Sequence, residues 1–195
     1  MAGGDLWFFD RVAPAYDRFM FGADAAAIRA GFAVADRPVR RVVDVAGGTG
    51  RGLAAVAPEE GMVVDASLPM LRRAHDQRIA SAAGDAGRLP LADESVDAVM
   101  IVDAFHHLPD SDAALSEAAR VVRPGGVVVL REFDPSTLRG RAIEVMEHLV
   151  RFDSTFFTPA EALERLEAAG LRGSVPDGGG GYTAAGVKPG GPDAD

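Results

Sequence analysis

The segment VVDVAGGTGRG, residues 42–52, joins a β-branched run to a glycine-rich turn and then to a helical stretch. Gly47, Gly48 and Gly50 lie where the backbone must bend sharply and approach a ligand, and side chains there would obstruct that approach. The amide groups of such a turn, and the start of the helix after it, can bind a carboxylate or a phosphate. The segment therefore predicts a strand, a turn and a helix that bind a small molecule.

Short β-branched runs alternate with helical stretches on both sides of this segment. Such runs suit strands buried on both faces, and the alternation predicts an α/β fold: a Rossmann-like, doubly wound, mostly parallel sheet with right-handed crossovers. The predicted strands are 42–46, 62–66, 96–102, 127–133, 171–175 and 182–187. The predicted helices are 5–21 and 22–35, which form an N-terminal helical cap, and 50–57, 67–77, 110–122, 138–151 and 159–169.

The length and the apolar content favour a single domain, residues 1–195. A chain of 195 residues, 48% of them hydrophobic, is long enough to bury one sizeable core. No apolar run approaches the roughly 18 residues that span a bilayer, and the N-terminus lacks the order of charges and apolar residues typical of a signal peptide. We therefore expect a cytoplasmic protein with no transmembrane segment.

Composition excludes several kinds of site. The chain has no cysteine, so disulfides, thiolate nucleophiles and thiolate metal sites are not available. The net charge of −9 argues against nucleic acid as the main partner, because phosphate contacts need a basic surface. Lys188 is the only lysine. This acidic surface fits either a high-salt cytoplasm or a GC-rich genome, and composition does not separate the two.

Three aspartates follow the predicted strands. Asp44 precedes the glycines and suits a cationic group, because it would repel a pyrophosphate. Asp65 ends the second strand, where its oxygens can accept hydrogen bonds from two ribose hydroxyls. Asp85 follows the apolar stretch 79–83 and could accept one from an adenine amine. Each could instead cap a helix or turn, but their order favours S-adenosylmethionine, which carries an ammonium and a ribose.

The blocks VVDVAGGTG, VVDAS, GDAGRLPLADESVDAV, AFHHL and VVRPGGVVVL resemble the successive motifs of class I S-adenosylmethionine-dependent methyltransferases, over about residues 40–135. FFDRVAPAYDRFM and FFTPAEALERLEAAGL resemble the branch that includes the menaquinone and ubiquinone C-methyltransferases. Quinone methyltransferases usually carry Phe-Gly-x-Arg-Asn after the fourth strand. This chain has Phe105-His106-His107-Leu108 instead, as the wider small-molecule methyltransferase group often does.

The resemblance implies a seven-stranded sheet and a role for each segment. Residues 1–35 would be the cap, 40–135 the cofactor-binding core, 136–188 the acceptor-side helices and last strands, and 189–195 a disordered tail. Asp44 and the glycine loop would hold the methionine end, Asp65 the ribose, and Asp85 with Ala86 the adenine. Asp103 would lie near the sulfonium, and Tyr16 would close over the cofactor or be a core aromatic. The implied cofactor residues are Tyr16, Asp44, Ala46, Gly47, Gly48, Gly50, Asp65, Ala66, Asp85, Ala86 and Asp103.

The acceptor implied by the resemblance is a small, apolar or aromatic molecule, with a quinone precursor among the candidates. Two aromatic stretches cover the acceptor pocket in this family, although ordinary core packing would also explain each ring. In this chain they contain Phe8, Phe9, Phe19, Phe21, Phe152, Phe156 and Phe157.

A catalytic base is needed only if the acceptor must lose a proton. The candidates are His106, His107, Asp103, Glu132 and Asp134. Adjacent histidines point in different directions on a helix or a strand, so we expect no metal site and at most one histidine in the pocket. A structural role for both histidines stays open.

Two other functions also stay open. GRGLAA, residues 50–55, formally fits the Gly-x-Gly-x-x-Ala of nicotinamide-dependent dehydrogenases. That fit starts too late after the strand, and too little chain remains for a second nucleotide-binding half. The second alternative is a non-catalytic module that keeps the fold and binds the cofactor as a sensor. The sequence does not indicate an oligomeric state.

Overall fold

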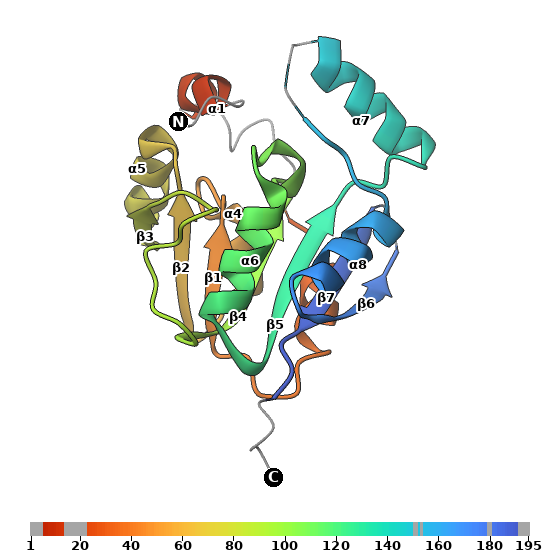
Figure 1. Ribbon diagram of the computed structural model, residues 1–195. Coiled ribbons are helices and arrows are strands. Elements are labelled where there is room, and N and C mark those ends of the chain that lie inside the picture. The colour runs from red at the N-terminus through yellow and green to blue at the C-terminus, as the bar shows by residue number, and fades with distance from the viewer. Residues whose placement is uncertain (1–5, 14–22, 150–151, 153, 179–180, 191–195) are drawn as a thin grey trace.

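The computed structural model describes residues 6–13, 23–149, 152, 154–178 and 181–190 (Figure 1). Within this part of the chain, a seven-stranded sheet has the order β3-β2-β1-β4-β5-β7-β6. Strands β1 to β5 pair in parallel, and β7 runs antiparallel to both β5 and β6. The predicted mostly parallel, seven-stranded sheet is confirmed. The strands are β1 (Arg41–Val45), β2 (Glu60–Asp65), β3 (Ala80–Ala83), β4 (Val96–Val102), β5 (Val122–Glu132), β6 (Arg172–Asp177) and β7 (Tyr182–Val187).

Helices cover both faces of the sheet, as a doubly wound fold requires. Alternate residues of β1 show this: Val43 belongs to the core cluster that contains α6 and α8 residues, and Val42 to the cluster that contains α3 and α4 residues. Figure 1 places α6 and α8 in front of the sheet, and α1 and α7 beyond the ends of the parallel strands. The helices are α1 (Leu6–Val12), α3 (Ala25–Phe32), α4 (Arg51–Val56), α5 (Leu68–Asp76), the 3-10 helix η1 (Phe105–His107), α6 (Ser111–Val121), α7 (Leu138–Leu149) and α8 (Pro159–Ala168).

The N-terminal helices are shorter than predicted. Helix α1 ends at Val12 and Ala13 lies in a turn, because a residue that precedes a proline disfavours helical backbone and Pro14 comes next. The prediction for 14–21 lies outside the described residues. Helix α3 begins only at Ala25, because the side chain of Asp24 caps it by accepting a hydrogen bond from Ala27 N at 3.1 Å.

The Pro-Gly-Gly segment lies inside a strand rather than between a helix and a strand. Strand β5 begins at Val122, which pairs with Val96, and the next pair joins Val127 to Ala98. The intervening residues of β5 therefore form a bulge. A Cβ atom on Gly126 would lie 2.5 Å from the backbone oxygen of Asp97, so the bulge requires a glycine there. No helix among the described residues is long and apolar enough to cross a bilayer.

Candidate active site

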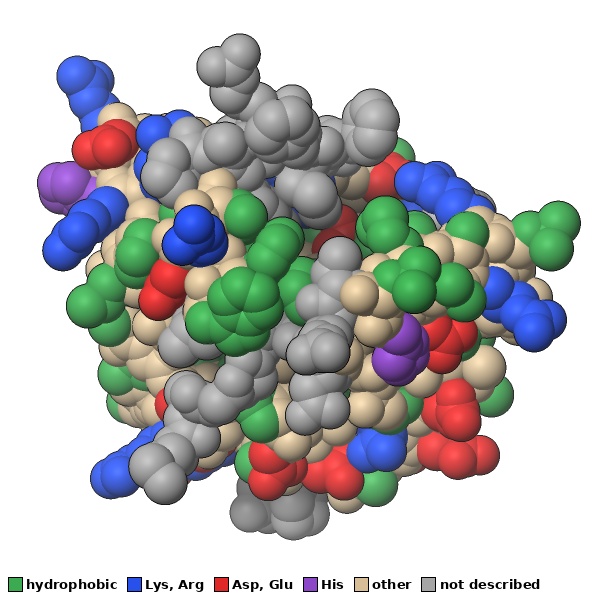
Figure 2. All heavy atoms as spheres, turned by 90° about the horizontal axis from the view of Figure 1, so that it is seen from above, with side chains coloured by type: hydrophobic (Ala, Val, Ile, Leu, Met, Phe, Trp, Pro, Cys, Tyr) green, Lys and Arg blue, Asp and Glu red, His purple; other side chains and the backbone are tan. Residues whose placement is uncertain are grey.

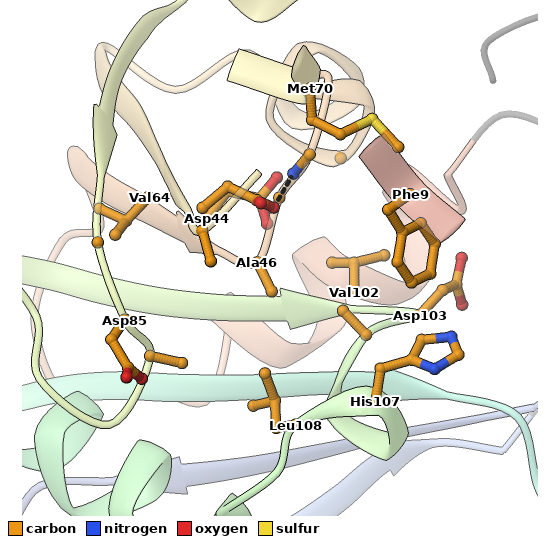
Figure 3. A pocket seen from close by; sticks show the side chains of 18 of the residues that line it. Phe9, Asp44, Ala46, Val64, Met70, Asp85, Val102, Asp103, His107 and Leu108 are labelled. Atoms are coloured by element: carbon orange, nitrogen blue, oxygen red, sulfur yellow. Dashed lines mark hydrogen bonds between the residues drawn. The ribbon is translucent and has the colours of Figure 1, made fainter. Parts of the chain in front are cut away.

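A cavity of about 630 Å³ lies beyond the carboxyl ends of β1, β2 and β4. Strand β1 lies between β2 and β4, so the direction of winding reverses beside it. Open α/β sheets bind their ligands at such a reversal. Figure 3 shows Asp85 at one end of the cavity, and Phe9, Asp103 and His107 together at the other. The predicted site residues that line the cavity are Asp44, Ala46, Gly47, Gly48, Asp65, Ala66, Asp85, Ala86, Asp103 and His107.

Three predicted site residues are not placed in the cavity wall. Tyr16 lies outside the described residues. Gly50 does not line the cavity but caps α4 with φ 83°, and a Cβ atom on it would lie 2.5 Å from Ile79 Cδ1. Its lack of a side chain therefore serves the packing of α4. His106 also does not line the cavity, and its buried contacts are described below.

The glycine turn is shaped around two aspartates. A Cβ atom on Gly47 would lie 2.5 Å from Asp44 Cγ, so this glycine leaves room for that carboxylate. Gly48, with φ 56°, donates its N–H to Asp65 Oδ2 at 2.8 Å, and Ser67 N donates to Asp65 Oδ1 at 2.7 Å. Each oxygen of Asp65 thus accepts a backbone hydrogen bond, and a carboxylate has up to four lone pairs, so it can also accept from a ligand. Burial raises the pKa of Asp65.

Asp44 is a buried aspartate of the cavity whose two carboxylate oxygens differ in their contacts. Its side chain is 1% exposed, and its Oδ2 accepts a hydrogen bond from Leu53 N at 3.2 Å. Its Oδ1 is buried and has no hydrogen-bond partner among the described residues. Burial raises the pKa of Asp44 to about 7, and the carboxylates of Asp65 and Asp103 act in the same direction. An unpartnered buried oxygen is costly, and a cationic donor in the cavity would satisfy it.

Arg51 is a cavity residue that the sequence analysis missed. Its Nη2 lies 3.1 Å from Asp103 Oδ2. Arg51 is the first residue of α4, where a positive charge opposes the helix dipole, and that unfavourable position was a signal in the sequence. Asp103 itself has φ 51°, and Ala46 has φ 54°, so two non-glycine residues of the cavity wall adopt left-handed backbone. Burial raises the pKa of Asp103, and so does the nearby charge of Glu132.

The prediction that the two histidines point apart is wrong. The 3-10 turn of η1 brings the ring centroids of His106 and His107 within 4.1 Å, and Nε2 of both rings approaches Glu147 Oε1 of α7, at 3.5 and 4.0 Å. Only His107 lines the cavity, which agrees with the expectation of one histidine in the pocket.

Two of the candidate bases, Glu132 and Asp134, accept hydrogen bonds from neighbouring residues and do not face the cavity. Glu132 accepts hydrogen bonds from Ala104 N and Phe105 N and lies 2.7 Å from His106 Nδ1, so it fixes the backbone after β4. Asp134 accepts hydrogen bonds from Ser136 N and Oγ. Neither carboxylate lines the cavity. Of the five candidates, Asp103 and His107 face it.

His106 is unsuited to take a proton. Burial by itself would lower its pKa, but the charge of Glu132 and the hydrogen bonds to Glu132 and Glu147 raise the pKa to about 10. With this pKa, the ring already carries its proton at neutral pH. The same contacts act on Glu147: burial opposes ionisation, but the hydrogen bond with His106 lowers its pKa.

Of the described phenylalanines in the two aromatic stretches, only Phe9 lines the cavity. Phe8 and Phe152 lie 4.7 Å apart by ring centroids, and Phe9 lies 5.0 Å from His107. Phe157 is different: it is buried, and its ring centroid lies 5.2 Å from that of Phe105 in the core. The expectation that Phe157 covers the acceptor pocket is wrong, because its packing partners belong to the sheet and α8. Phe19 and Phe21 lie outside the described residues.

Comparison with known proteins identifies the core of the fold. Residues 43–130 match the family described as "Methyltransferase domain". Residues 43–130 of this chain form a methyltransferase domain. The matched segment covers the glycine turn and the five aspartates that line the cavity, Asp44, Asp65, Asp85, Asp103 and Asp110.

Relatives of the methyltransferase domain include a demethylmenaquinone methyltransferase of Mycobacterium marinum, 37% identical over 137 residues. This match covers 69% of the chain and 57% of the relative, so the chain spans little more than half the length of such relatives. A Thermotoga maritima structure, titled a SAM-dependent methyltransferase and possible histamine N-methyltransferase, has a TM-score of 0.79 and 24% identity, covering 93% of this chain and 99% of that one. The structure of the [4+2]-cyclase SpnF has a TM-score of 0.74 and 17% identity, covering 98% of both chains. The last two likenesses concern the fold alone.

Proposed function

We propose that this chain transfers the methyl group of S-adenosylmethionine to a small apolar or aromatic acceptor. The observation that carries the proposal is the buried Oδ1 of Asp44, which lacks a hydrogen-bond partner among the described residues and belongs to a cavity residue. A carboxylate oxygen in this state fits an ammonium group, whereas a phosphate would be repelled by it. The methionine end of S-adenosylmethionine offers such an ammonium, and a nicotinamide dinucleotide does not.

The other cavity residues fit the remaining groups of this cofactor. Asp65 offers its carboxylate oxygens to the ribose hydroxyls. Asp85 lies at the far end of the cavity (Figure 3), where it would hold the adenine together with Ala86, the next residue in the chain. Asp44, Asp65 and Asp103 make the wall acidic, which favours a cationic ligand. When bound, S-adenosylmethionine supplies a methyl group activated by its sulfonium.

The acceptor would lie at the end of the cavity where Phe9, Asp103 and His107 meet. The protein's contribution to methyl transfer is then alignment and exclusion of water, since the methyl group is already activated. His107 is placed to take a proton from an acceptor that must lose one, while Asp103 is held by Arg51. The ring of Phe9 would stack on a flat, aromatic acceptor. The relatives' name favours a quinone precursor, although the segment Phe105-His106-His107-Leu108 departs from the quinone methyltransferase pattern.

Calorimetry with the purified chain tests the cofactor. We expect S-adenosylmethionine and S-adenosylhomocysteine to bind with micromolar-range affinity and NAD not to bind. Tight NAD binding without a response to S-adenosylhomocysteine would instead support the dehydrogenase alternative.

The acceptor is tested with methyl-labelled cofactor and a panel of hydroquinones and phenols, followed by mass spectrometry. Phe9→Ala should then lower kcat/KM for the acceptor while the affinity for S-adenosylhomocysteine stays the same. Binding of the cofactor without transfer to any acceptor in the panel or in a cell extract would favour a sensor module.

We further propose that the acidic surface is an adaptation to salt. The chain has 29 acidic residues against 20 Lys and Arg, and Figure 2 shows both signs of charge mostly toward the rim of the face at the strand ends. The excess of carboxylates implies a net repulsion among them. If this repulsion matters, the melting temperature should rise between low and molar KCl, because salt screens it. A melting temperature that is constant or falls with KCl would leave genome composition as the explanation.

A further inference from the structure

His106, His107 and Glu147 form a cluster at the boundary between the cavity and α7. One ligand atom from each residue can be chosen so that all three lie within 4.8 Å of one another. Nε2 of His106 lies 3.5 Å, and Nε2 of His107 4.0 Å, from Glu147 Oε1. Ligand atoms around a tetrahedral Zn²⁺ are roughly 3.3 Å apart at normal bond lengths, so small movements of the side chains would bring these atoms to binding distance.

The groups behind these atoms hold them in place. Nδ1 of His106 lies 2.7 Å from Glu132 Oε2, and Nδ1 of His107 lies 3.2 Å from Ser154 Oγ. The same hydroxyl donates to Glu147 Oε2 at 2.7 Å. Each ligand residue thus uses its outer atom on a neighbouring group and directs its other atom toward the shared centre. Metal-binding histidines usually have such outer partners, which fix the ring orientation.

The surroundings suit a cation. The side chains of His106, His107 and Glu147 are 2%, 12% and 10% exposed, so water screens the cluster poorly. Two carboxylates, Glu132 and Glu147, approach His106 from opposite ring atoms. Protons on His106 and His107 would pair with the same carboxylates, and a bound cation would replace these protons. A divalent cation accounts for all three ligand atoms.

We propose that His106, His107 and Glu147 bind a divalent transition-metal ion of the zinc type. Two histidines and one glutamate are a common donor set for zinc sites that keep a fourth position open. Because His107 also lines the cavity, such an ion would lie beside the acceptor end, where it could bind an oxygen atom of the acceptor. Binding of the ion does not depend on the cofactor, because none of its ligands is assigned to the cofactor. With the ion bound, His107 would serve as a ligand and would not act as the base.

The test uses the full chain with any affinity tag removed and bound metal stripped by a chelator. Zn²⁺ is titrated against a competing fluorescent chelator, and metal content is measured by mass spectrometry after gel filtration. We expect one zinc per chain. Glu147→Gln and His107→Gln should each weaken binding by at least about 100-fold, and Ser154→Ala, which leaves the ligands in place, by about tenfold. Glu144→Gln and His148→Gln on the same helix are matched controls and should bind zinc as the wild type does.

Circular dichroism and S-adenosylhomocysteine affinity are measured on every variant. Loss of zinc with normal folding and normal cofactor affinity separates this site from the methyltransferase proposal. If Glu147→Gln or His107→Gln fails to fold, the weaker binding of the Ser154→Ala variant decides the matter. Less than one zinc per chain in the wild type, or equal zinc affinity in wild type and in all folded variants of the cluster, would overturn the proposal.

Discussion

Asp44→Asn should lower the affinity for S-adenosylmethionine about 100-fold, because it removes the charge that would partner a buried ammonium. The substitution keeps the shape of the side chain and leaves an oxygen that can accept the hydrogen bond of Leu53 N. Calorimetry with the wild type and the variant measures the difference. Asp76→Asn, an exposed position near the end of α5, is the matched control and should leave the affinity unchanged.

Without cofactor, Asp44→Asn should become more stable relative to the wild type as the pH rises. The pKa of Asp44 is raised from 3.8 to about 7 by burial. Between these values the unfolded chain releases a proton that the folded chain keeps, so folding stability falls as pH rises. Asparagine does not titrate. The free energy of unfolding of the variant, relative to that of the wild type, should therefore increase by roughly 2–3 kcal/mol from pH 5 to pH 8.

Chemical denaturation of both proteins at each pH measures this relative change. Asp65 and Asp103 also have raised pKa values, and they are present in both proteins, so the part of their contribution that is independent of the Asp44 charge cancels in the comparison. A difference in unfolding free energy that is the same at pH 5 and pH 8 would show that Asp44 is not held in a desolvated state. An unchanged affinity for S-adenosylmethionine would remove the observation that carries the proposed function.

Asp65→Ala should weaken the binding of S-adenosylhomocysteine by at least about 100-fold. Two charge-assisted hydrogen bonds to the ribose would be lost, each worth about 1.5–3 kcal/mol. The substitution also leaves Gly48 N and Ser67 N without their partner, so we expect a lower melting temperature as well. Asp65→Asn keeps one acceptor oxygen and should fall between the wild type and Asp65→Ala in affinity.

Calorimetry and thermal melting of the two Asp65 variants separate a loss of ribose contacts from a loosened glycine turn. If Asp65→Asn melts as the wild type does and still binds weakly, the carboxylate contacts the ligand. Normal affinity in both variants would mean that the ribose is held elsewhere. Asp76→Ala again serves as the exposed control.

The sequence by itself determined the sheet and the ends of several helices. Strand β4 has the predicted bounds because six of its seven residues are apolar, and that pattern is local. Ser67 and the pair Thr158-Pro159 begin α5 and α8 as predicted, since a cap depends on residues within one turn. The positions of Asp44, Asp65 and Asp85 around one cavity follow from the same local order, because parallel strands all end at one edge of the sheet.

Only the tertiary structure decided which atoms are buried and what they face. Phe156 and Phe157 are adjacent in the sequence, yet the first stacks on His106 and the second packs in the core, according to how α8 lies on the sheet. The approach of Glu147 to the two histidines depends on where α7 lies relative to η1, and no local pattern specifies that. The missing partner of Asp44 Oδ1 is likewise a property of the packed cavity. Burial and long-range contact arise from packing of elements distant in the chain, so a pattern of neighbouring residues does not contain them.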